Sequence, residues 1–305
     1  MKVDVMIPTY KPTAGFQKTL EMLLQQTIVP NHIWIVNTEE CYWNKKLEQL
    51  SNKISVKHIK KSEFDHGATR NLGASQSKAD VILFMTDDAT PADNHLIQNM
   101  LSYLNKEKTA AVYARQLPNA DCSLLEKYTR TFNYPEVSKV KGKQDIETMG
   151  IKAFFCSNVC AAYKRKIFEE RGGFINRTIF NEDMIYCGGL LRDDYYVAYA
   201  AEACVYHSHN YGPMEQLRRN FDLGVSQADH PEIFSGISSE REGVRLVKKT
   251  ALHFIHEKKP WILITLVIQS VFKFLGYQLG KHYKKLSKKT IMSLTMNQAY
   301  WNKEE

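Results

Sequence analysis

The sequence lacks the paired cysteines of a zinc site: it has six cysteines in 305 residues, and none forms a C-x-x-C pair. Cys156 and Cys160 lie four residues apart, a spacing that predicts no zinc site without a second pair. We therefore expect reduced, buried thiols of the kind found in cytosolic proteins. No leader segment stands before the first expected strand, so we expect a chain that begins folded and stays in the cytoplasm.

Internal repeats are also missing, which excludes a solenoid. Hydrophobic residues make up 44% of the chain and charged residues 24%, a balance that excludes a disordered or collagen-like protein. A chain of 305 residues can form one large catalytic domain with an extension, or two small domains.

The charge is moderately positive, with 41 Lys and Arg against 33 Asp and Glu. This balance suits an anionic partner (nucleic acid, an acidic membrane or a phosphorylated substrate) or serves solubility alone. The basic residues crowd the C-terminal part of the chain, which favours a membrane surface. Because no recognition motif for nucleic acid accompanies them, we expect no nucleic-acid partner.

Short apolar runs alternate with helical spacing in the first half of the chain. The runs expected to form strands are 3–7 (closed by Pro8), 33–36, 56–59, 81–85 and 111–113. The alternation predicts an α/β fold with a parallel, doubly wound sheet. Such sheets bind ligands at the carboxyl ends of their strands, so the residues that follow each run are the first candidates for a site.

Asp87 and Asp88 directly follow the buried run 81–85. Carboxylates near a core are costly unless they are neutralised, and Mg²⁺ or Mn²⁺ bridging them to a diphosphate would neutralise them. The alternative is a helix cap, provided by Asp88 or by Asp93.

A glycine joins a strand end to a helix start in the segment from Phe64 to Gly73. The exposed amides of a helix N-terminus and the guanidinium of Arg70 favour an anion there. The alternative is ordinary packing, with Gly67 in a turn and Gly73 against the sheet.

Two further pairs lie in the second half. Glu182 and Asp183 are adjacent, and two neighbouring carboxylates raise each other's pKa, as suits a general base near neutral pH; the alternative is a solvated helix start. His207 and His209 lie two residues apart, so on an extended chain they point the same way. Either histidine would complete a metal site, and the alternative is a structural role.

In their order and spacing these segments resemble glycosyltransferase family 2, and within it the bacterial rhamnosyltransferase-like subgroup. The resemblance covers roughly residues 1–212. It is carried by Ile7-Pro8-Thr9-Tyr10, by His66-Gly67 with Arg70-Asn71-Leu72-Gly73, by Phe84-Met85-Thr86-Asp87-Asp88-Ala89-Thr90-Pro91, and by Gly172-Gly173-Phe174 with Asn181-Glu182-Asp183.

The resemblance implies a GT-A, Rossmann-like catalytic domain over 1–212 and a helical, basic C-terminal extension over 213–305. It implies that Asp183 is the catalytic base and that Asp88 and His207 are ligands of a divalent cation, Mg²⁺ or Mn²⁺. The residues that it implies for nucleotide-sugar binding are Pro8, Thr9, Tyr10, Asn37, Glu39, His66, Gly67, Arg70, Asp87 and Arg219.

The sequence departs from the family pattern in three places. Thr86 occupies the first position of the D-x-D motif and Asp88 the second, which leaves Asp87 for the ribose or a bound water. Asn37 or Glu39 takes the base-contacting role after the second strand. Asn220 replaces the tryptophan of a Q-x-x-R-W motif, which favours addition of a single sugar.

The implied activity is an inverting transfer of a sugar, by subgroup likeness rhamnose from dTDP-rhamnose, to a glycan or lipid-linked acceptor in cell-surface polysaccharide synthesis. The alternative is an inactive nucleotide-sugar-binding module of the same fold. A nucleotidyltransferase is disfavoured, because the loop after the first strand is not glycine-rich.

The segment 262–279 is apolar and about as long as a membrane-spanning helix, but Gln269, Ser270 and Lys273 interrupt it. A central lysine and basic flanks on both sides disfavour a span. We expect a helix lying in the plane of the inner face of the plasma membrane, and thus a peripheral protein. The alternative is a helix that completes the protein core.

Overall fold

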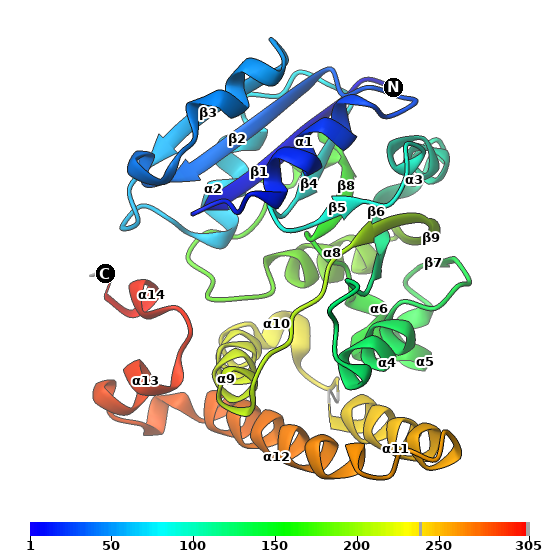
Figure 1. Ribbon diagram of the computed structural model, residues 1–305, viewed down its shortest axis with the longest axis vertical. Helices are drawn as coiled ribbons and strands as arrows, with labels where there is room; N and C mark the ends of the chain where they lie inside the picture. The colour runs from blue at the N-terminus through cyan, green and yellow to red at the C-terminus, as the bar shows by residue number, and fades with distance from the viewer. Residues whose placement is uncertain (238–239, 303–305) are drawn as a thin grey trace. The chain divides into compact units, whose positions relative to one another are not determined.

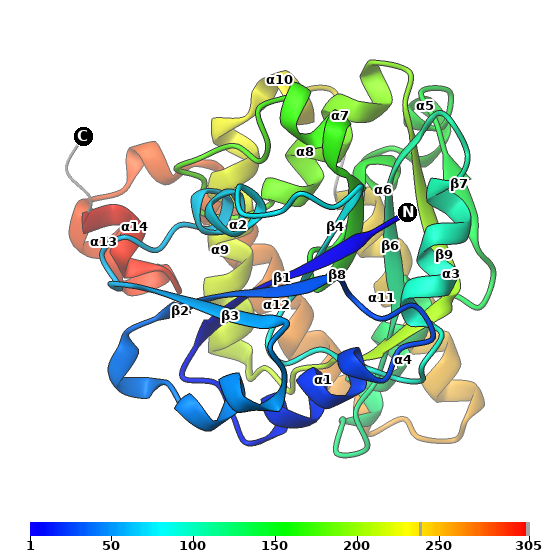
Figure 2. The same ribbon diagram turned by 90° about the horizontal axis from the view of Figure 1, so that it is seen from above.

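The computed structural model describes residues 1–237 and 240–302. By its internal packing the chain forms two compact units, whose elements are labelled in Figure 1 and shown from above in Figure 2. Unit 1 comprises Met1–Asn119, Tyr134–Arg177 and Glu182–His207, and unit 2 comprises Ala120–Asn133, Thr178–Asn181 and Ser208–Glu305. The expected domain division at residue 212 stays a prediction, since these units are defined by packing alone.

Unit 1 is built on a sheet with nine strands among the described residues, in the order β3-β2-β1-β4-β8-β6-β9-β5, with β7 paired to β9. The strands are β1 (Val3–Tyr10), β2 (His32–Thr38), β3 (Ile54–Ile59), β4 (Val81–Met85), β5 (Thr90–Pro91), β6 (Thr109–Leu117), β7 (Lys139–Lys141), β8 (Cys160–Lys164) and β9 (Tyr196–Tyr206). Its helices are α1 (Gly15–Leu24), η1 (Glu40–Tyr42), η2 (Lys45–Leu50), α2 (His66–Ala74), α3 (Leu96–Leu104), α5 (Asp145–Met149), α6 (Ile151–Phe154), α7 (Arg165–Glu170) and α8 (Glu182–Arg192).

The first four strands pair in parallel, as the alternation of strands and helices predicts. A fully parallel sheet is nevertheless wrong, because β8 runs antiparallel to both β4 and β6. Cys160, the first residue of β8, pairs with Met85, the last residue of β4. The chain therefore enters β8 from the carboxyl edge of the parallel strands, and without a crossover back to the amino edge the strand has to run in the opposite direction.

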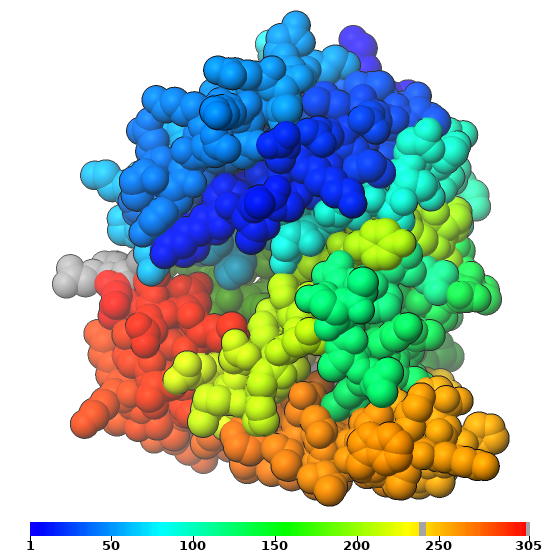
Figure 3. All heavy atoms as spheres, in the orientation of Figure 1, coloured from blue at the N-terminus to red at the C-terminus, as the bar shows by residue number. Residues whose placement is uncertain are grey.

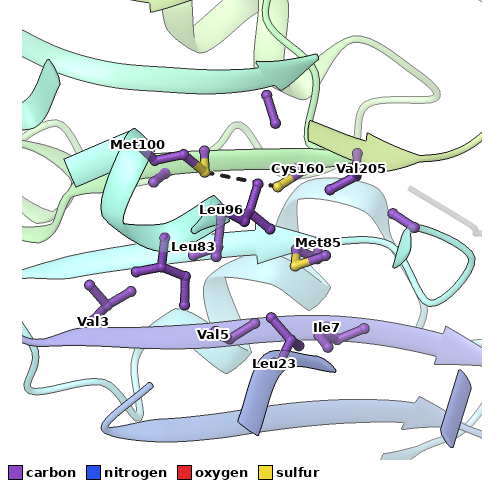
Figure 4. Close-up of a cluster of buried hydrophobic side chains, with 14 of the residues drawn as sticks. Val3, Val5, Ile7, Leu23, Leu83, Met85, Leu96, Met100, Cys160 and Val205 are labelled. Carbon is purple, nitrogen blue, oxygen red and sulfur yellow. Dashed lines mark hydrogen bonds between the residues drawn. The ribbon is translucent and has the colours of Figure 1, made fainter. Parts of the chain in front are cut away.

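β1 extends beyond Pro8 to Tyr10, so the expectation that Pro8 closes this strand is wrong. Proline's fixed φ fits a strand, and its only loss is one donor. The main core lies between the sheet and its helices, where alternate residues of a strand face the same side. Figure 4 shows Val5 of β1, Met85 of β4 and Leu96 of α3 in this cluster, each at most 1% exposed. Burial of one such side chain contributes about 1.5–3 kcal/mol, which gives the strand ends a rigid support.

All six cysteines are free thiols. Cys156, Cys160 and Cys187 are buried as expected, whereas Cys41 is exposed. The expectation of buried thiols is therefore correct only for part of the set.

Unit 2 is helical, which confirms the predicted helical C-terminal region. Its helices are α4 (Leu124–Asn133), α9 (Pro213–Asp229), α10 (Pro231–Phe234), α11 (Glu240–His256), α12 (Ile262–Lys281), η3 (Tyr283–Lys285), α13 (Lys288–Leu294) and α14 (Gln298–Asn302). α12 covers the predicted segment 262–279. Among the described residues it is the one helix with the length and hydropathy for a membrane span, a mean hydropathy of 1.6. Length and composition of this kind are also found in core helices of soluble proteins.

α12 packs closely on α9 through glycines. A Cβ on Gly276 would lie 2.1 Å from the Leu217 carbonyl oxygen, and one on Gly280 would lie 2.1 Å from the Phe221 carbonyl oxygen. The opposite face of α12 is exposed, and the side chains of α11 and α12 are visible as the orange surface in Figure 3. α12 therefore has one face fixed to unit 2 and one face free of it.

Candidate active site

Asp87 and Asp88 follow β4 at the carboxyl edge of the sheet. Asp88 is exposed, whereas Asp87 is partly buried. Burial, and then the negative charge of Asp88, raise the pKa of Asp87 to about 6, although backbone N–H groups of Tyr10 and Asp87 partly offset this. The hydroxyl oxygen of Thr86 has no hydrogen-bond partner within the described part of the chain. A cation would relieve the repulsion between the two carboxylates.

His207 lies immediately after β9, and its Nε2 is 3.5 Å from Oδ2 of Asp88. Its Nδ1 donates to Oε1 of Gln116 at 2.9 Å, and Gln116 in turn donates to the Ser157 hydroxyl at 3.0 Å. These bonds fix the ring and direct the lone pair of Nε2 towards Asp88, an arrangement typical of metal-binding histidines. Asp88 and His207 thus fit a divalent cation. His209 belongs to unit 2, and both histidines stay candidates.

Glu182 and Asp183 begin α8, and the two carboxylates have different surroundings. Glu182 is 5% exposed and lies 3.2 Å from Nη1 of Arg70, which also donates to the His66 carbonyl at 2.9 Å. Burial opposes ionisation of Glu182, but the charges of Arg70 and His66 and the hydrogen bond from Asn158 together outweigh it and lower the pKa. Arg70 is therefore bound to Glu182, a partner that the sequence did not indicate.

Asp183 is partly exposed and is held by two backbone donors. Its Oδ2 accepts from the Asn158 N–H at 2.9 Å, and its Oδ1 accepts from the Met184 N–H at 2.7 Å. Burial, and then the charge of Glu182, raise the pKa of Asp183 to about 7. A carboxylate with this pKa can take a proton near neutral pH, because both of its protonation states are then accessible.

Asn158 links the two acids, and sequence reasoning missed it. Besides its backbone bond to Asp183, its side-chain amide donates to Oε1 of Glu182 at 3.1 Å. The Tyr163 hydroxyl donates to Oδ1 of Asn158 at 2.9 Å, which fixes the orientation of the amide. A single asparagine before a strand belongs to no sequence pattern, so only the tertiary structure identifies it as a positioning residue.

The segment His66–Gly73 is tied to the glycine-rich loop at 172–176. Asn71 accepts from the Phe174 N–H at 2.9 Å and donates to the Phe174 carbonyl at 2.7 Å. A Cβ on Gly67 would lie 1.9 Å from the Ile175 carbonyl oxygen, so only glycine allows this approach. Asp65 caps α2 by accepting from the N–H groups of Gly67 and Ala68. These two motifs therefore support each other and place Arg70 beside Glu182.

The loop after β2 is organised around Asn37, which is fully buried. Its side chain accepts from the Thr9 hydroxyl at 2.9 Å and donates to the Glu39 carbonyl and to Nδ1 of His58. Glu39 accepts from the backbone N–H of Lys61 at 2.6 Å. Asn37 thus links the ends of β1, β2 and β3 through the hydrogen bonds of its side-chain amide.

Beside this loop, Pro8 is partly buried and Tyr10 is exposed at the end of β1. The rings of Tyr10 and Tyr42 meet edge to face at 5.8 Å, and the Lys11 ammonium lies 4.5 Å from the centroid of Tyr42. Tyr42 and Lys11 were not among the predicted site residues. Two aromatic rings beside a cation form a surface that suits a nucleotide.

Arg219 belongs to unit 2, on α9. Its guanidinium lies 4.7 Å from the ring centroid of Phe180 and 5.8 Å from that of Tyr211. These stacking contacts place the predicted arginine on an aromatic support within its own unit.

Comparison with known proteins gives a consistent result. The profile of glycosyl transferase family 2 matches residues 4–172. The O-antigen chain rhamnosyltransferase RfbN of Salmonella typhimurium is 40% identical over 306 residues, which cover 99% of this chain and 96% of that protein. The O-antigen chain rhamnosyltransferase WbaN of Salmonella anatum is 37% identical over 304 residues, which cover 98% of this chain and 95% of that protein.

Two solved structures resemble the chain at low sequence identity. S. aureus TarS 1–349 in complex with UDP-GlcNAc has a TM-score of 0.52 at 11% identity, over 93% of this chain and 92% of that chain. Mannosyltransferase PcManGT from Pyrobaculum calidifontis, in complex with GDP-Man and Mn²⁺, has a TM-score of 0.54 at 16% identity, over 98% of this chain and 84% of that chain. At such identities the likeness concerns the fold alone, and it confirms the expected GT-A fold class.

Proposed function

The chain belongs to glycosyl transferase family 2 and is a glycosyltransferase of polysaccharide synthesis. We propose that it transfers rhamnose from dTDP-rhamnose, with inversion, to a glycan or lipid-linked acceptor. The observation that carries the proposed chemistry is the position of Asp183, a partly exposed carboxylate that two N–H groups hold beside Glu182, where burial and the charge of Glu182 raise its pKa. The rhamnosyl donor is proposed by analogy with the two Salmonella relatives.

In this mechanism Asp183 accepts the proton of the acceptor hydroxyl while that oxygen forms a bond to the anomeric carbon. The bond from this carbon to the diphosphate oxygen breaks, and the nucleotide diphosphate leaves with the electron pair. Attack opposite the leaving group inverts the anomeric configuration. Asn158 keeps Asp183 in place, and burial, together with the charge of Glu182, keeps the pKa of Asp183 high enough to bind the proton.

The donor would lie at the carboxyl edge of the parallel strands, where such sheets bind ligands. Tyr10, Tyr42 and Lys11 offer rings and a positive charge to the nucleotide. Asp88 and His207 would hold Mg²⁺ or Mn²⁺, which when bound supplies positive charge to the leaving diphosphate. Because Arg70 is paired with Glu182, it would act on the catalytic base, Asp183, rather than on the diphosphate.

A membrane position is supported by the exposed face of α12. That face is apolar along its length: Trp261, Ile264, Val267, Ile268, Val271, Phe274 and Leu275 are each at least 43% exposed. Gln269, Ser270 and Lys273, which interrupt the apolar segment in sequence, are all less exposed than this face. Exposed lysines lie at both ends of the helix, at Lys258 and from Lys281 onward. This combination favours a helix lying in an anionic membrane surface, at the cytoplasmic face.

A panel of nucleotide sugars tests the function. The purified protein should release nucleotide diphosphate from dTDP-rhamnose with Mn²⁺ or Mg²⁺ present. Excess EDTA, or Asp88→Ala, should remove nearly all of this release, because without the cation nothing would supply that positive charge to the leaving diphosphate. Release at full rate in EDTA would contradict the metal role. An inactive binding module would bind dTDP-rhamnose without turnover of any sugar in the panel.

A further inference from the structure

Unit 2 contains a cavity of its own, with a volume of about 150 Å³. It is lined by Ser123, Glu126, His209, Asn210, Tyr211, Gln216, Thr265 and Gln269. The lining comes from the start of α4, the segment before α9, α9 itself and α12. None of these residues belongs to the predicted catalytic or nucleotide-binding residues, and one of them, His209, is also a candidate metal ligand.

The size of the cavity fits one six-membered ring. A cavity of about 150 Å³ in a protein core accommodates benzene when its walls are apolar. Here every lining side chain carries a hydrogen-bonding group. A ring that matches these walls therefore has to be polar around its edge, as a pyranose is.

The charges of the lining residues favour a neutral ligand over an anionic one. The lining contains neither lysine nor arginine, and its one carboxylate, Glu126, is already paired with Arg130, whose Nε donates to Oε1 of Glu126 at 2.6 Å. A phosphate needs cationic or multiple N–H donors, which these walls do not concentrate. The remaining groups are amides, hydroxyls and two rings, which suit a neutral ligand with several hydroxyls.

The walls are also held in place. Asn210 accepts from the Ser123 N–H at 2.9 Å, and Gln269 donates to the Tyr211 carbonyl at 3.4 Å. The rings of His209 and Tyr211 stack at 4.8 Å between centroids and 24° between planes, which gives a flat surface for the C–H face of a sugar. Preorganised polar groups of this kind confer specificity at low entropic cost.

We propose that this cavity binds one pyranose ring of the acceptor glycan, an inference that rests on the proposed glycosyl transfer. His209, Asn210 and Tyr211 follow His207 directly along the chain. The cavity wall is therefore continuous in sequence with a candidate metal ligand. The site selects the acceptor and takes no part in binding the nucleotide.

The test uses the full chain and saturation-transfer NMR with the methyl glycosides of rhamnose, mannose, galactose and glucose. Two variants change the wall: Thr265→Val removes an exposed hydroxyl at constant shape, and Gln269→Leu removes an amide. The matched control is Gln278→Leu, on the same helix but outside the cavity. Binding of dTDP-rhamnose and release of nucleotide diphosphate without acceptor are measured in parallel.

At least one methyl glycoside should show saturation transfer with the wild type and with Gln278→Leu, and the signal should fall at least about fivefold in both wall variants. Donor binding and donor release should stay unchanged. No signal with any glycoside, or equal signals in all variants, would overturn the cavity proposal while leaving the transferase proposal intact. If the wild type released no nucleotide diphosphate from dTDP-rhamnose, that result would instead contradict the proposed function. Thr265 is exposed, so its variant keeps the test valid if Gln269→Leu does not fold.

Discussion

Two adjacent acids at the start of α8 carry different charges because their neighbours differ. Arg70 stabilises the ionised form of Glu182, and the resulting negative charge, added to burial, raises the pKa of Asp183 to about 7. The base is therefore tuned by a residue that does not itself need to contact the substrate. Asn158 bonds to both acids and fixes their separation.

The pH dependence of transfer follows from this arrangement. Asp183 accepts a proton only when ionised, so the transfer rate should fall as the pH drops below about 7. Asp183→Asn should keep dTDP-rhamnose affinity and lower transfer by at least about a hundredfold. Glu182→Gln removes the negative neighbour and leaves Arg70 positive, so the acidic limb should move to lower pH. Initial rates across pH 5–9 would show these effects, and normal transfer by Asp183→Asn would end the assignment.

The sequence indicated the residues of this site unevenly. Asp88 and Asp183 were predicted because each is a carboxylate at a motif position. Asn158 could not be predicted, and neither could the pairing of Arg70 with Glu182, because both depend on side chains brought together by folding. That Asn37 contacts the nucleobase stays a prediction. The hydrogen bonds that its buried side-chain amide makes within the loop favour a supporting role.

At the scale of elements, the contact between α9 and α12 depends on the absence of side chains at glycines. In Gly276→Ala the new Cβ would lie 2.1 Å from the Leu217 carbonyl oxygen, so the helices would have to separate. We expect a loss of about 1–3 kcal/mol of unfolding free energy, the usual cost of overpacking. Gly243→Ala on α11 is the control: its Cβ meets nothing within 4 Å, and removing a helical glycine should slightly stabilise the protein. Thermal unfolding of both variants measures the difference in stability, and equal melting temperatures would contradict the close packing of α9 and α12.

The exposed face of α12 makes a second prediction at this scale. The wild type should float with vesicles of anionic phospholipid and not with neutral vesicles, and high salt should release it. Val267→Asp should abolish flotation, because it places a charge within the apolar face. Val137→Asp is the matched control, an exposed valine of unit 1 outside that face.

Resistance of the bound protein to both salt and carbonate would mean that α12 spans the membrane. Failure to bind any vesicle would mean that the helix belongs to the protein core. Equal flotation of the two valine variants would contradict the role of this face.

The apolar pattern of the sequence predicted most elements of the first half well, because the strands there are short apolar runs that are buried, and helices such as α1 and α3 bury one regular face. It did not predict β8, since the direction of that strand depends on the route of the chain and not on its own five residues. The position of α12 in the sequence was predicted correctly. The structure was needed to show that Lys273 lies outside the exposed apolar face of this helix.

At the scale of the whole molecule, the chain belongs to one enzyme family but folds as two packing units. Unit 2 includes residues 120–133, far in sequence from the C-terminal helices with which they pack. No local pattern marks such an insertion, so the sequence alone did not indicate that residues 120–133 pack with the C-terminal helices, and the division at residue 212 stays a prediction. The acidic pair and the candidate metal pair both belong to unit 1, and the polar cavity belongs to unit 2.

The central claim is direct displacement with Asp183 as the base, and the anomeric configuration of the transferred sugar tests it most directly. The configuration would be measured by NMR on the first product formed from dTDP-rhamnose and a glycan acceptor, before any later step can change it. The account predicts a product whose rhamnose has the opposite anomeric configuration to the donor, with no sugar bound covalently to the protein. A product that retains the donor configuration would contradict it.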